Sequence, residues 1–208
     1  LRSDGSCKEA DKYVEESTPL LDAIKMSNLT SLSLSKTGMG PKICNRLATS
    51  FSAVLNEVNM SGNPLTGGDV WRDGSVQLGT DVSGVSILFP AMTAVITLNV
   101  SNCGLGPSAM PELSKLVRDA SAALKKIALS NNFLFGSTRS MGRTFHDVDA
   151  DQSGWSALCD ALPGSPVEEL DVSNIGMGVN GVTSLAKAIS AGAVLNDVDM
   201  SGTGCGGH

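Results

Sequence analysis

The sequence predicts an α/β fold in which short parallel strands alternate with helices. Three observations support this prediction. An eleven-residue phrase with alternating apolar residues occurs six times along the chain of 208 residues. Glycine-rich turns follow the phrases, and apolar residues at helical spacing follow several of these turns. Strands that alternate with helical segments are typical of parallel sheets, because a parallel connection needs a crossover segment.

Each copy of the phrase predicts one strand. Apolar residues stand at its first position and again three, five and ten residues later, and serine stands six residues after the first position. The copies predict strands near residues 29–35, 55–61, 95–101, 124–130, 167–173 and 195–201. Because side chains alternate along a strand, we expect the apolar residue three positions after the start of each phrase to be buried, with the six strands adjacent and parallel. These residues are Leu32, Val58, Leu98, Ile127, Leu170 and Val198.

Segments after the first, third and fifth copies predict helices. Their apolar residues recur at intervals of three and four, which places them on one helical face. The residues are Ile43, Leu47 and Phe51, then Leu113, Leu116, Val117 and Ala120, and finally Val182, Leu185, Ala186 and Ile189. We expect these faces to pack against the sheet.

Long and short intervals between the copies alternate, which predicts that the true unit is a pair of repeats. The two long intervals contain inserts at residues 66–81 and 135–151. Each insert ends with an aspartate, Asp81 or Asp151, two residues ahead of a serine, and either the aspartate or the serine is a predicted N-cap of the helix that follows. Asp73 and Gly74 predict the turn of a small hairpin. Because equivalent positions of a repeat array stack, we expect both inserts to project from the same side as a ridge.

The phrase resembles the consensus of the leucine-rich repeat, L-x-x-L-x-L-x-x-N/C-x-L. The polar position eight residues into the phrase holds matching residues in three copies, namely Asn63, Cys103 and Asn132. Thr37, Ile175 and Thr203 depart from it. In the family, this side chain satisfies backbone groups of the turn, so the turn at Ile175 is predicted to lack that support.

The spacing of strand, turn and helix is similar to that of ribonuclease-inhibitor-type repeats. The resemblance covers the chain from about Pro19 to Gly204. It implies a single open, curved solenoid of about six repeats over residues 1–208, with a parallel sheet inside and helices outside. Repeat arrays need polar capping repeats at their ends, and the sequence has no evident one. We therefore expect a piece of a longer array, or an array whose ends are covered.

Composition excludes several classes of protein. Hydrophobic residues make up 41% of the chain and aromatic residues 4%, so the core must be built from aliphatic side chains. The formal net charge is −6, which argues against a nucleic-acid-binding protein, since such proteins usually carry a basic face. No stretch reaches the roughly 18 apolar residues that a membrane-spanning helix needs.

Five widely spaced cysteines predict buried thiols, and we expect Cys44, Cys103 and Cys159 to be reduced. An oxidising compartment would allow one or two disulfides. No signal peptide is visible after Leu1, and together with the unpaired cysteines this favours an intracellular protein. The first residue is not Met, which is consistent with processing or truncation.

No catalytic, cofactor or metal site is predicted. His146 lies in an insert without a nameable orienting partner, so we expect no enzyme. Asp147, Asp149 and Asp151 have the spacing of the first half of a calcium loop. However, Gln152 replaces the loop glycine and the terminal glutamate is missing. A solvated acidic turn ahead of a helix cap is the favoured interpretation, and calcium binding is the alternative.

The sequence predicts a noncatalytic module that binds or scaffolds another protein. One candidate surface is the exposed sheet face, which becomes acidic toward the end of the chain and suits a basic partner. Its candidate contacts are Glu57, Asn59, Lys126, Glu169, Asp171, Asp197 and Asp199. The second surface is the ridge of inserts, with Trp71, Arg72, Arg139 and Arg143. Trp71 either staples its hairpin to the solenoid or is an exposed anchor.

Two further functions remain open at this point. The chain could be a structural subunit that docks neighbours in a larger assembly. It could also be a regulator or inhibitor that covers an enzyme or a GTPase, as some relatives of this repeat type do. Fold alone does not decide among these functions.

Overall fold

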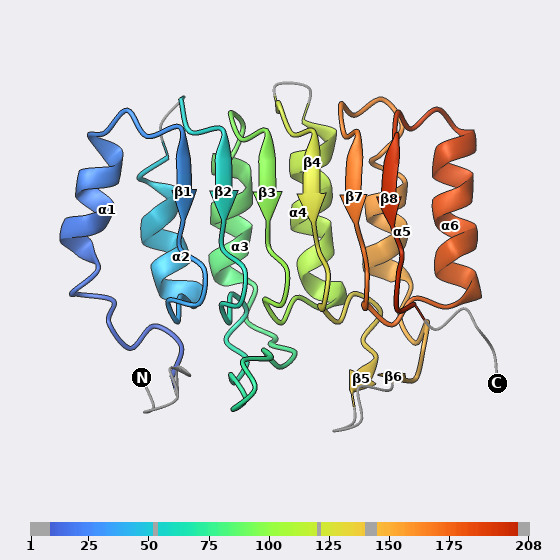
Figure 1. Cartoon of the computed structure of the whole chain (residues 1–208), viewed down its shortest axis with the longest axis horizontal. Coiled ribbons are helices and arrows are strands. Elements are labelled where there is room, and N and C mark those ends of the chain that lie inside the picture. Colours follow the sequence, from blue (N-terminus) through green and yellow to red (C-terminus); the bar gives the residue numbers. More distant parts are fainter. Residues whose placement is uncertain (1–8, 52–53, 120–121, 140–144, 204–208) are drawn as a thin grey trace.

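A computed structural model describes residues 9–51, 54–119, 122–139 and 145–203 of the chain. It is an α/β fold around a six-stranded, all-parallel sheet with the order β1-β2-β3-β4-β7-β8 (Figure 1). The strands are β1 (Ser31–Ser33), β2 (Glu57–Asn59), β3 (Thr97–Asn99), β4 (Lys126–Ala128), β7 (Glu169–Asp171) and β8 (Asp197–Asp199). Each copy of the phrase therefore forms one strand, as the sequence predicts.

The strand register is also confirmed. The central residue of each strand lies opposite the central residue of the next strand, from Leu32 and Val58 through to Leu170 and Val198. Five of these six side chains are buried, whereas Val198 is only partly buried. In the described part of the chain β8 pairs with β7 alone, so its outer side lacks the cover that the inner strands have.

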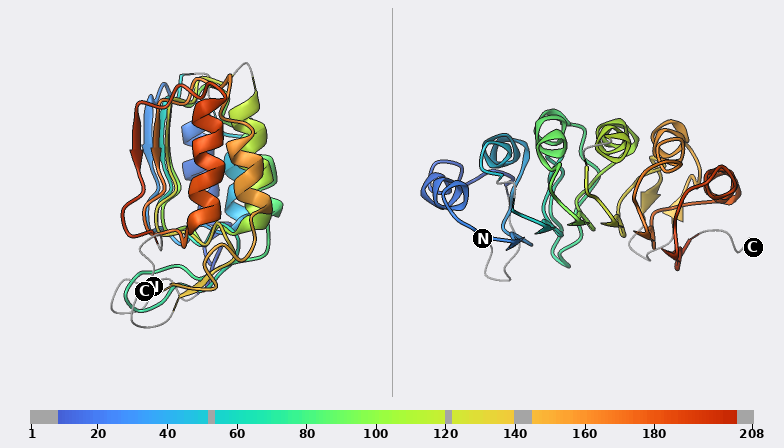
Figure 2. Two further views of the ribbon diagram at one scale, coloured as in Figure 1. Left: turned by 90° about the vertical axis from the view of Figure 1, so that its right-hand side faces the viewer. Right: turned by 90° about the horizontal axis from the view of Figure 1, so that it is seen from above.

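The helices of the described residues all lie on one face of the sheet, and no described segment covers the other face (Figure 2). The described residues form α1 (Thr18–Lys25), α2 (Pro41–Ala48), α3 (Ser83–Leu88), α4 (Met110–Arg118), α5 (Ser153–Cys159) and α6 (Val179–Ser190). Two short 3₁₀ turns, η1 (Phe89–Ala91) and η2 (Pro107–Ala109), adjoin α3 and α4. The core between sheet and helices is mainly aliphatic, with Trp155 and Phe135 in contact at 5.5 Å between ring centroids.

The predicted helical faces are confirmed in part. Ile43, Leu47, Leu113, Leu116, Val117 and Leu185 are buried as expected. Phe51 is only partly buried, because α2 ends at Ala48 before reaching it. The prediction is wrong for Ala186 and Ile189, which lie on the outer side of α6 and are exposed. Ala120 lies outside the described residues.

The turn after each strand has one recurrent design. The residue seven positions into the phrase has a positive φ in every copy, which favours glycine and asparagine. These residues are Lys36, Gly62, Asn102, Asn131, Asn174 and Gly202. Their amides, except that of the last, donate to the carbonyl oxygen of the repeated serine in the following copy, as from Asn174 to Ser201 at 2.9 Å. The repeated serines thus take part in a row of backbone hydrogen bonds that joins neighbouring turns along this edge of the sheet.

Two buried asparagines join neighbouring turns. Asn132 accepts hydrogen bonds from the amides of Cys103 and Leu105 and donates to the carbonyls of Val100 and Leu129. Asn63 fills the equivalent place between the first two copies. The turn at Ile175 forms without such a side chain, and Ile175 instead packs into the core.

The cysteine prediction holds for the described residues. Cys44, Cys103 and Cys159 are free and buried. Burial disfavours the thiolate and raises the pKa of all three thiols, that of Cys103 and Cys159 to about 12. These thiols are therefore poor nucleophiles near neutral pH. Cys7 and Cys205 lie outside the described residues.

Both inserts contain antiparallel pairing and project from the carboxyl-end edge of the sheet (Figure 1). Val70 pairs with Val76 in the first insert, and β5 (Thr138–Arg139) pairs with β6 (Phe145–His146) in the second. The predicted ridge on one side is confirmed. The predicted caps are displaced by one residue, because Val82 and Gln152 occupy the N-cap positions. Asp81 and Asp151 instead accept the amide hydrogen bonds of Ser83 and Ser153, the first helical residues.

Candidate protein-interaction surface

The uncovered sheet face carries two straight rows of side chains. The register aligns one outward residue per strand in each row. The first row is Ser31, Glu57, Thr97, Lys126, Glu169 and Asp197, and the second is Ser33, Asn59, Asn99, Ala128, Asp171 and Asp199. All seven residues predicted for this face therefore lie on one continuous surface.

The second row also holds the turns that follow the strands. The Oδ1 atom of Asn59, Asn99, Asp171 or Asp199 accepts the amide hydrogen bond of the serine two residues later, at 2.8 to 3.0 Å. Asparagine and aspartate share this ability, and serine and threonine hydroxyls do the same more weakly. The sequence predicts Asn59, Asp171 and Asp199 as partner contacts and gives no account of this structural role. The signal was present, because Asn or Asp precedes the repeated serine by two residues in four copies.

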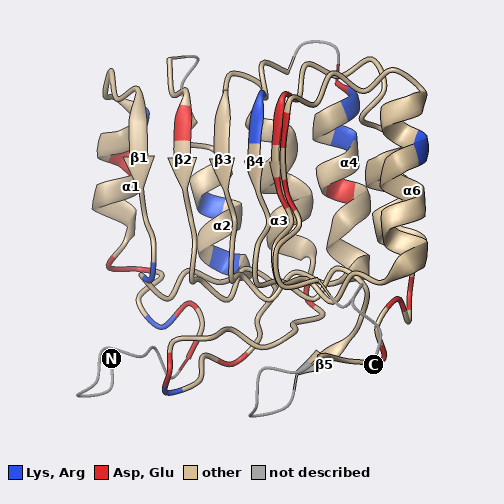
Figure 3. Cartoon of the chain, turned by 45° about the vertical axis from the view of Figure 1, so that its right-hand side comes forward, with Lys and Arg blue, Asp and Glu red and all other residues tan. Residues whose placement is uncertain are grey.

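The acidic end of the face lies on β7 and β8, beside the lysine of β4 (Figure 3). Lys126 forms an ion pair with Glu169 at 2.5 Å, and this carboxylate raises the pKa of Lys126. Asp171 and Asp197 raise it further through their charge. Hydrogen bonds from Ser201 lower the pKa of Asp199 below its usual value, so its carboxylate is ionised at neutral pH. This end of the face therefore presents a concentrated negative charge.

The insert at residues 66–81 is fixed to the sheet by Asn102. Its side chain accepts a hydrogen bond from the amide of Val76 and donates to the carbonyl of Gly74, both at 2.8 Å. Val76, which pairs with Val70 in the hairpin, is buried. Trp71, in the same hairpin, is 40% exposed.

The remaining predicted ridge residues are placed only in part. Arg72 is exposed beside Trp71. Arg139 belongs to β5, where its backbone lies opposite Phe145 of β6. Arg143 lies outside the described residues. The placed residues are therefore distributed over two hairpins that project from the same edge of the sheet.

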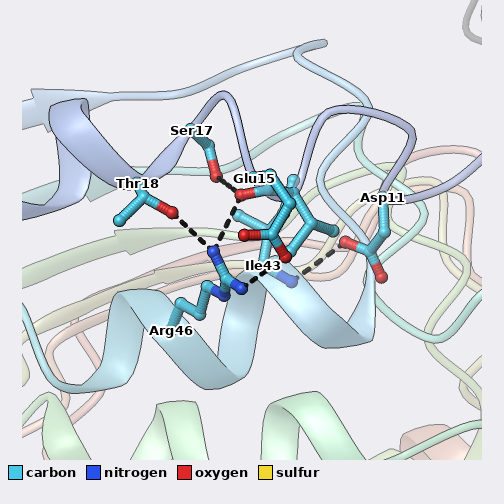
Figure 4. A network of polar contacts seen from close by, with 7 residues as sticks. Asp11, Glu15, Ser17, Thr18, Ile43 and Arg46 are labelled. Carbon is cyan, nitrogen blue, oxygen red and sulfur yellow. Dashed lines mark hydrogen bonds and ion pairs between the residues drawn. The ribbon is translucent and has the colours of Figure 1, made fainter.

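Two aspartates, Asp149 in the second insert and Asp11 near the start of the chain, cap helices that lie far from them in the sequence. Asp149 has a φ of 59° and accepts hydrogen bonds from the amides of Gly178 and Asn180 at the start of α6. Asp11 has a φ of 60° and does the same for Gly40, Lys42 and Ile43 at the start of α2. Figure 4 shows Asp11 against α2, next to the ion pair of Arg46 and Glu15 at 2.7 Å.

These contacts give Asp149 a structural role in the motif that resembles half a calcium loop. Both of its carboxylate oxygens bind helix amides, and Asp151 binds Ser153. Sequence reasoning missed Asp149 and Asp11 as caps because each acts on a helix about thirty residues further on. The available signal was the glycine before each helix, Gly178 or Gly40, which has no side chain to cap it.

An open hollow of about 430 Å³ lies between the first insert and the start of α2. Asp11, Lys42, Asp69 and Asp81 are among its lining residues. Among the described residues, no group of three or more histidine, cysteine or acidic side chains is placed to hold a metal ion. Within the same residues, no helix has the length and apolar character needed to cross a membrane.

Comparisons with known proteins identify no family for this chain. No protein-family model matches it, and a search of curated proteins finds no match either.

Proposed function

We propose that the chain is a leucine-rich-repeat solenoid of the ribonuclease-inhibitor type that binds or scaffolds another protein without catalysis. The observation that carries this proposal is the uncovered face of the six-stranded sheet, with its two aligned rows of polar side chains. Because a wide, rigid surface of this kind is already ordered, little conformational entropy is lost when a partner binds to it.

The repeat assignment is supported by the agreement between phrase and structure. Each phrase gives one parallel strand, and all helices lie on the opposite face of the sheet. Buried Asn63 and Asn132 satisfy turn backbone groups at the position where the leucine-rich-repeat consensus has asparagine or cysteine. Cys103, at the same position of the third copy, directs its thiol toward the carbonyl of Met60.

The charge of the surface favours a basic partner. Asp171, Asp197, Asp199 and Glu169 lie on two adjacent strands, and Lys126 is the cation beside them. Complementary charge accelerates association and rejects acidic proteins. The insert ridge adds half-exposed Trp71 at the neighbouring edge, and an aromatic anchor contributes apolar contact that charge alone does not give.

The proposal is tested by comparing the proteins that variants of the chain capture from a lysate of its source. In the first variant, Glu169→Gln, Asp171→Asn, Asp197→Asn and Asp199→Asn remove the charge from the acidic end. The changes Asp171→Asn and Asp199→Asn are not expected to disturb the turns, because Asn59 and Asn99 already perform the same role in this chain. In the second variant, both inserts are shortened to two-residue turns.

We expect quantitative mass spectrometry to show a set of basic proteins that the wild-type chain enriches and the neutralised variant loses. Asp22→Asn with Asp160→Asn is the matched control, because both residues are exposed and belong to the helical side. Retention of the full set by the neutralised variant and its loss by the control would contradict binding at the sheet face. Loss of the set only on shortening the inserts would assign binding to the ridge.

A further inference from the structure

Lys126 is the one cation in the two rows of the uncovered sheet face, as far as the described strands extend (Figure 3). It lies directly opposite Glu169 on the next strand, and its ammonium group binds that carboxylate at 2.5 Å. Asp197 lies opposite Glu169 on β8, and Asp171 follows Glu169 in the second row. Lys126 therefore stands at the boundary between the uncharged face of β3 and the acidic end on β7 and β8.

The surrounding carboxylates keep Lys126 in its charged form. The hydrogen bond to Glu169, and after it the charges of Glu169, Asp197 and Asp171, raise the pKa of Lys126. The chain itself thus supplies one positive charge to an acidic end of four carboxylates, which also includes Asp199. A basic protein that approaches this end meets a like charge among the carboxylates, and like charges at contact distance repel.

The ion pair of Lys126 and Glu169 is placed so that it can open. It lies on one side of a shallow hollow of about 70 Å³, whose lining includes the carboxylates of β7 and β8. Its two side chains are 52% and 42% exposed, so water solvates both charges when they separate and the pair contributes little to stability. Thr97 on β3 and Ala128 on β4 are small and uncharged, which leaves Lys126 room to turn away from Glu169.

We propose that Lys126 is an internal counter-ion that a basic partner must displace from Glu169, and that it thereby determines how basic an accepted partner must be. A cation of the partner takes over Glu169, and Lys126 turns toward β3 and solvent. A cluster of neighbouring cations, such as consecutive arginines, meets this requirement. The inference rests on the proposed function, because it concerns the acidic end of the same sheet face.

Lys125 provides a matched control. It forms an ion pair with Glu168 at 2.7 Å, and its side chain is 53% exposed, as in the pair of Lys126. Lys125 directly precedes β4, so it stands at the amino-end edge of the sheet and belongs to neither row. Replacement of either lysine by glutamine changes the net charge equally, but only Lys126 is bound to the acidic end.

The test uses a hexa-arginine peptide with blocked ends as the probe. It is titrated into the wild-type chain and into Lys126→Gln, Lys126→Arg and Lys125→Gln, and the Kd is obtained from the NMR shifts of the amides of β4, β7 and β8. We expect Lys126→Gln to lower the Kd at least about fivefold and Lys125→Gln to lower it less than about twofold, since screening weakens distant charges. Lys126→Arg keeps the counter-ion and should bind as the wild type does.

The same titration in a Glu169→Gln background separates displacement from net charge. If Lys126 acts by occupying Glu169, the gain from Lys126→Gln should fall below about twofold in this background. Equal gains from the two lysine variants, or an undiminished gain in the Glu169→Gln background, would overturn the inference and leave the proposed function intact. A peptide that shifts no amide of β7 or β8 in any variant would instead overturn the acidic end as a binding surface.

Discussion

At the scale of single residues, the buried asparagines hold neighbouring turns together. Asn132 satisfies four backbone groups of two adjacent turns and is almost fully buried. Asn132→Ala leaves these groups without partners, and each buried unpaired group costs roughly 1–3 kcal/mol. We expect the free energy of unfolding in urea to fall by at least about 3 kcal/mol. Exposed Asn196→Ala is the control and should change it by less than about 0.5 kcal/mol.

A second residue-scale prediction concerns pH. The hydroxyl and then the amide of Ser153 lower the pKa of Asp151 below 3.8. Because the folded-state pKa is lowered, the resulting stability is present above the usual aspartate pKa and is lost as pH falls through the lowered one. Ser153→Ala should raise the NMR titration midpoint of the Asp151 carboxyl toward 3.8, whereas Ser153→Thr should keep it low. A midpoint that does not move in Ser153→Ala would show that the hydroxyl contributes nothing.

At the scale of elements, the second insert projects from the fold and also holds the start of a helix. Asp149 provides the cap of α6 across a gap in the sequence. Asp149→Gly removes the carboxylate while keeping a residue that tolerates the φ of 59°. We expect a loss of about 0.5–2 kcal/mol, the usual value of an N-cap. Calorimetric or urea unfolding measures this change.

Asp147 supplies the matched control for this prediction. It has a φ of 57° in the same turn, and its carboxylate is not part of the cap. Asp147→Gly should therefore leave stability unchanged or raise it slightly, since the strain of a left-handed aspartate is relieved. Equal losses in the two variants would mean that the turn itself, and not the cap, determines the effect.

The sequence predicts the strands better than it predicts which helix faces are covered and which residues cap the helices, and the reason is physical. Alternation and the repeated serine are local, so the register from Leu32 to Val198 follows from spacing alone. The exposure of Ile189 depends on whether a neighbour covers α6, and periodicity gives no information about that. The caps by Asp11 and Asp149 depend on tertiary approach over long sequence distances, so the glycine before each helix indicates a missing cap but does not identify the residue that supplies it.

The candidate surface is also predicted from the sequence only in part. Alternation predicts which residues share the uncovered sheet face, including Glu57 and Lys126. It does not predict that Asp171 and Asp199 hold turns through Ser173 and Ser201, because that role follows from where each strand ends. A charge reversal there would damage the turn and the surface together. Asparagine substitutions separate the two effects.

At the scale of the whole molecule, the uncovered sheet face is the surface that we propose receives a basic protein. Carboxylate footprinting of the complex with a captured partner tests this most directly. Carbodiimide-driven labelling of each acidic residue is read by mass spectrometry with and without the partner. We predict that Glu169, Asp171, Asp197 and Asp199 become protected while Asp22 and Asp160 of the helical side label as before. Protection of the helical residues with full labelling of β7 and β8 would contradict the account.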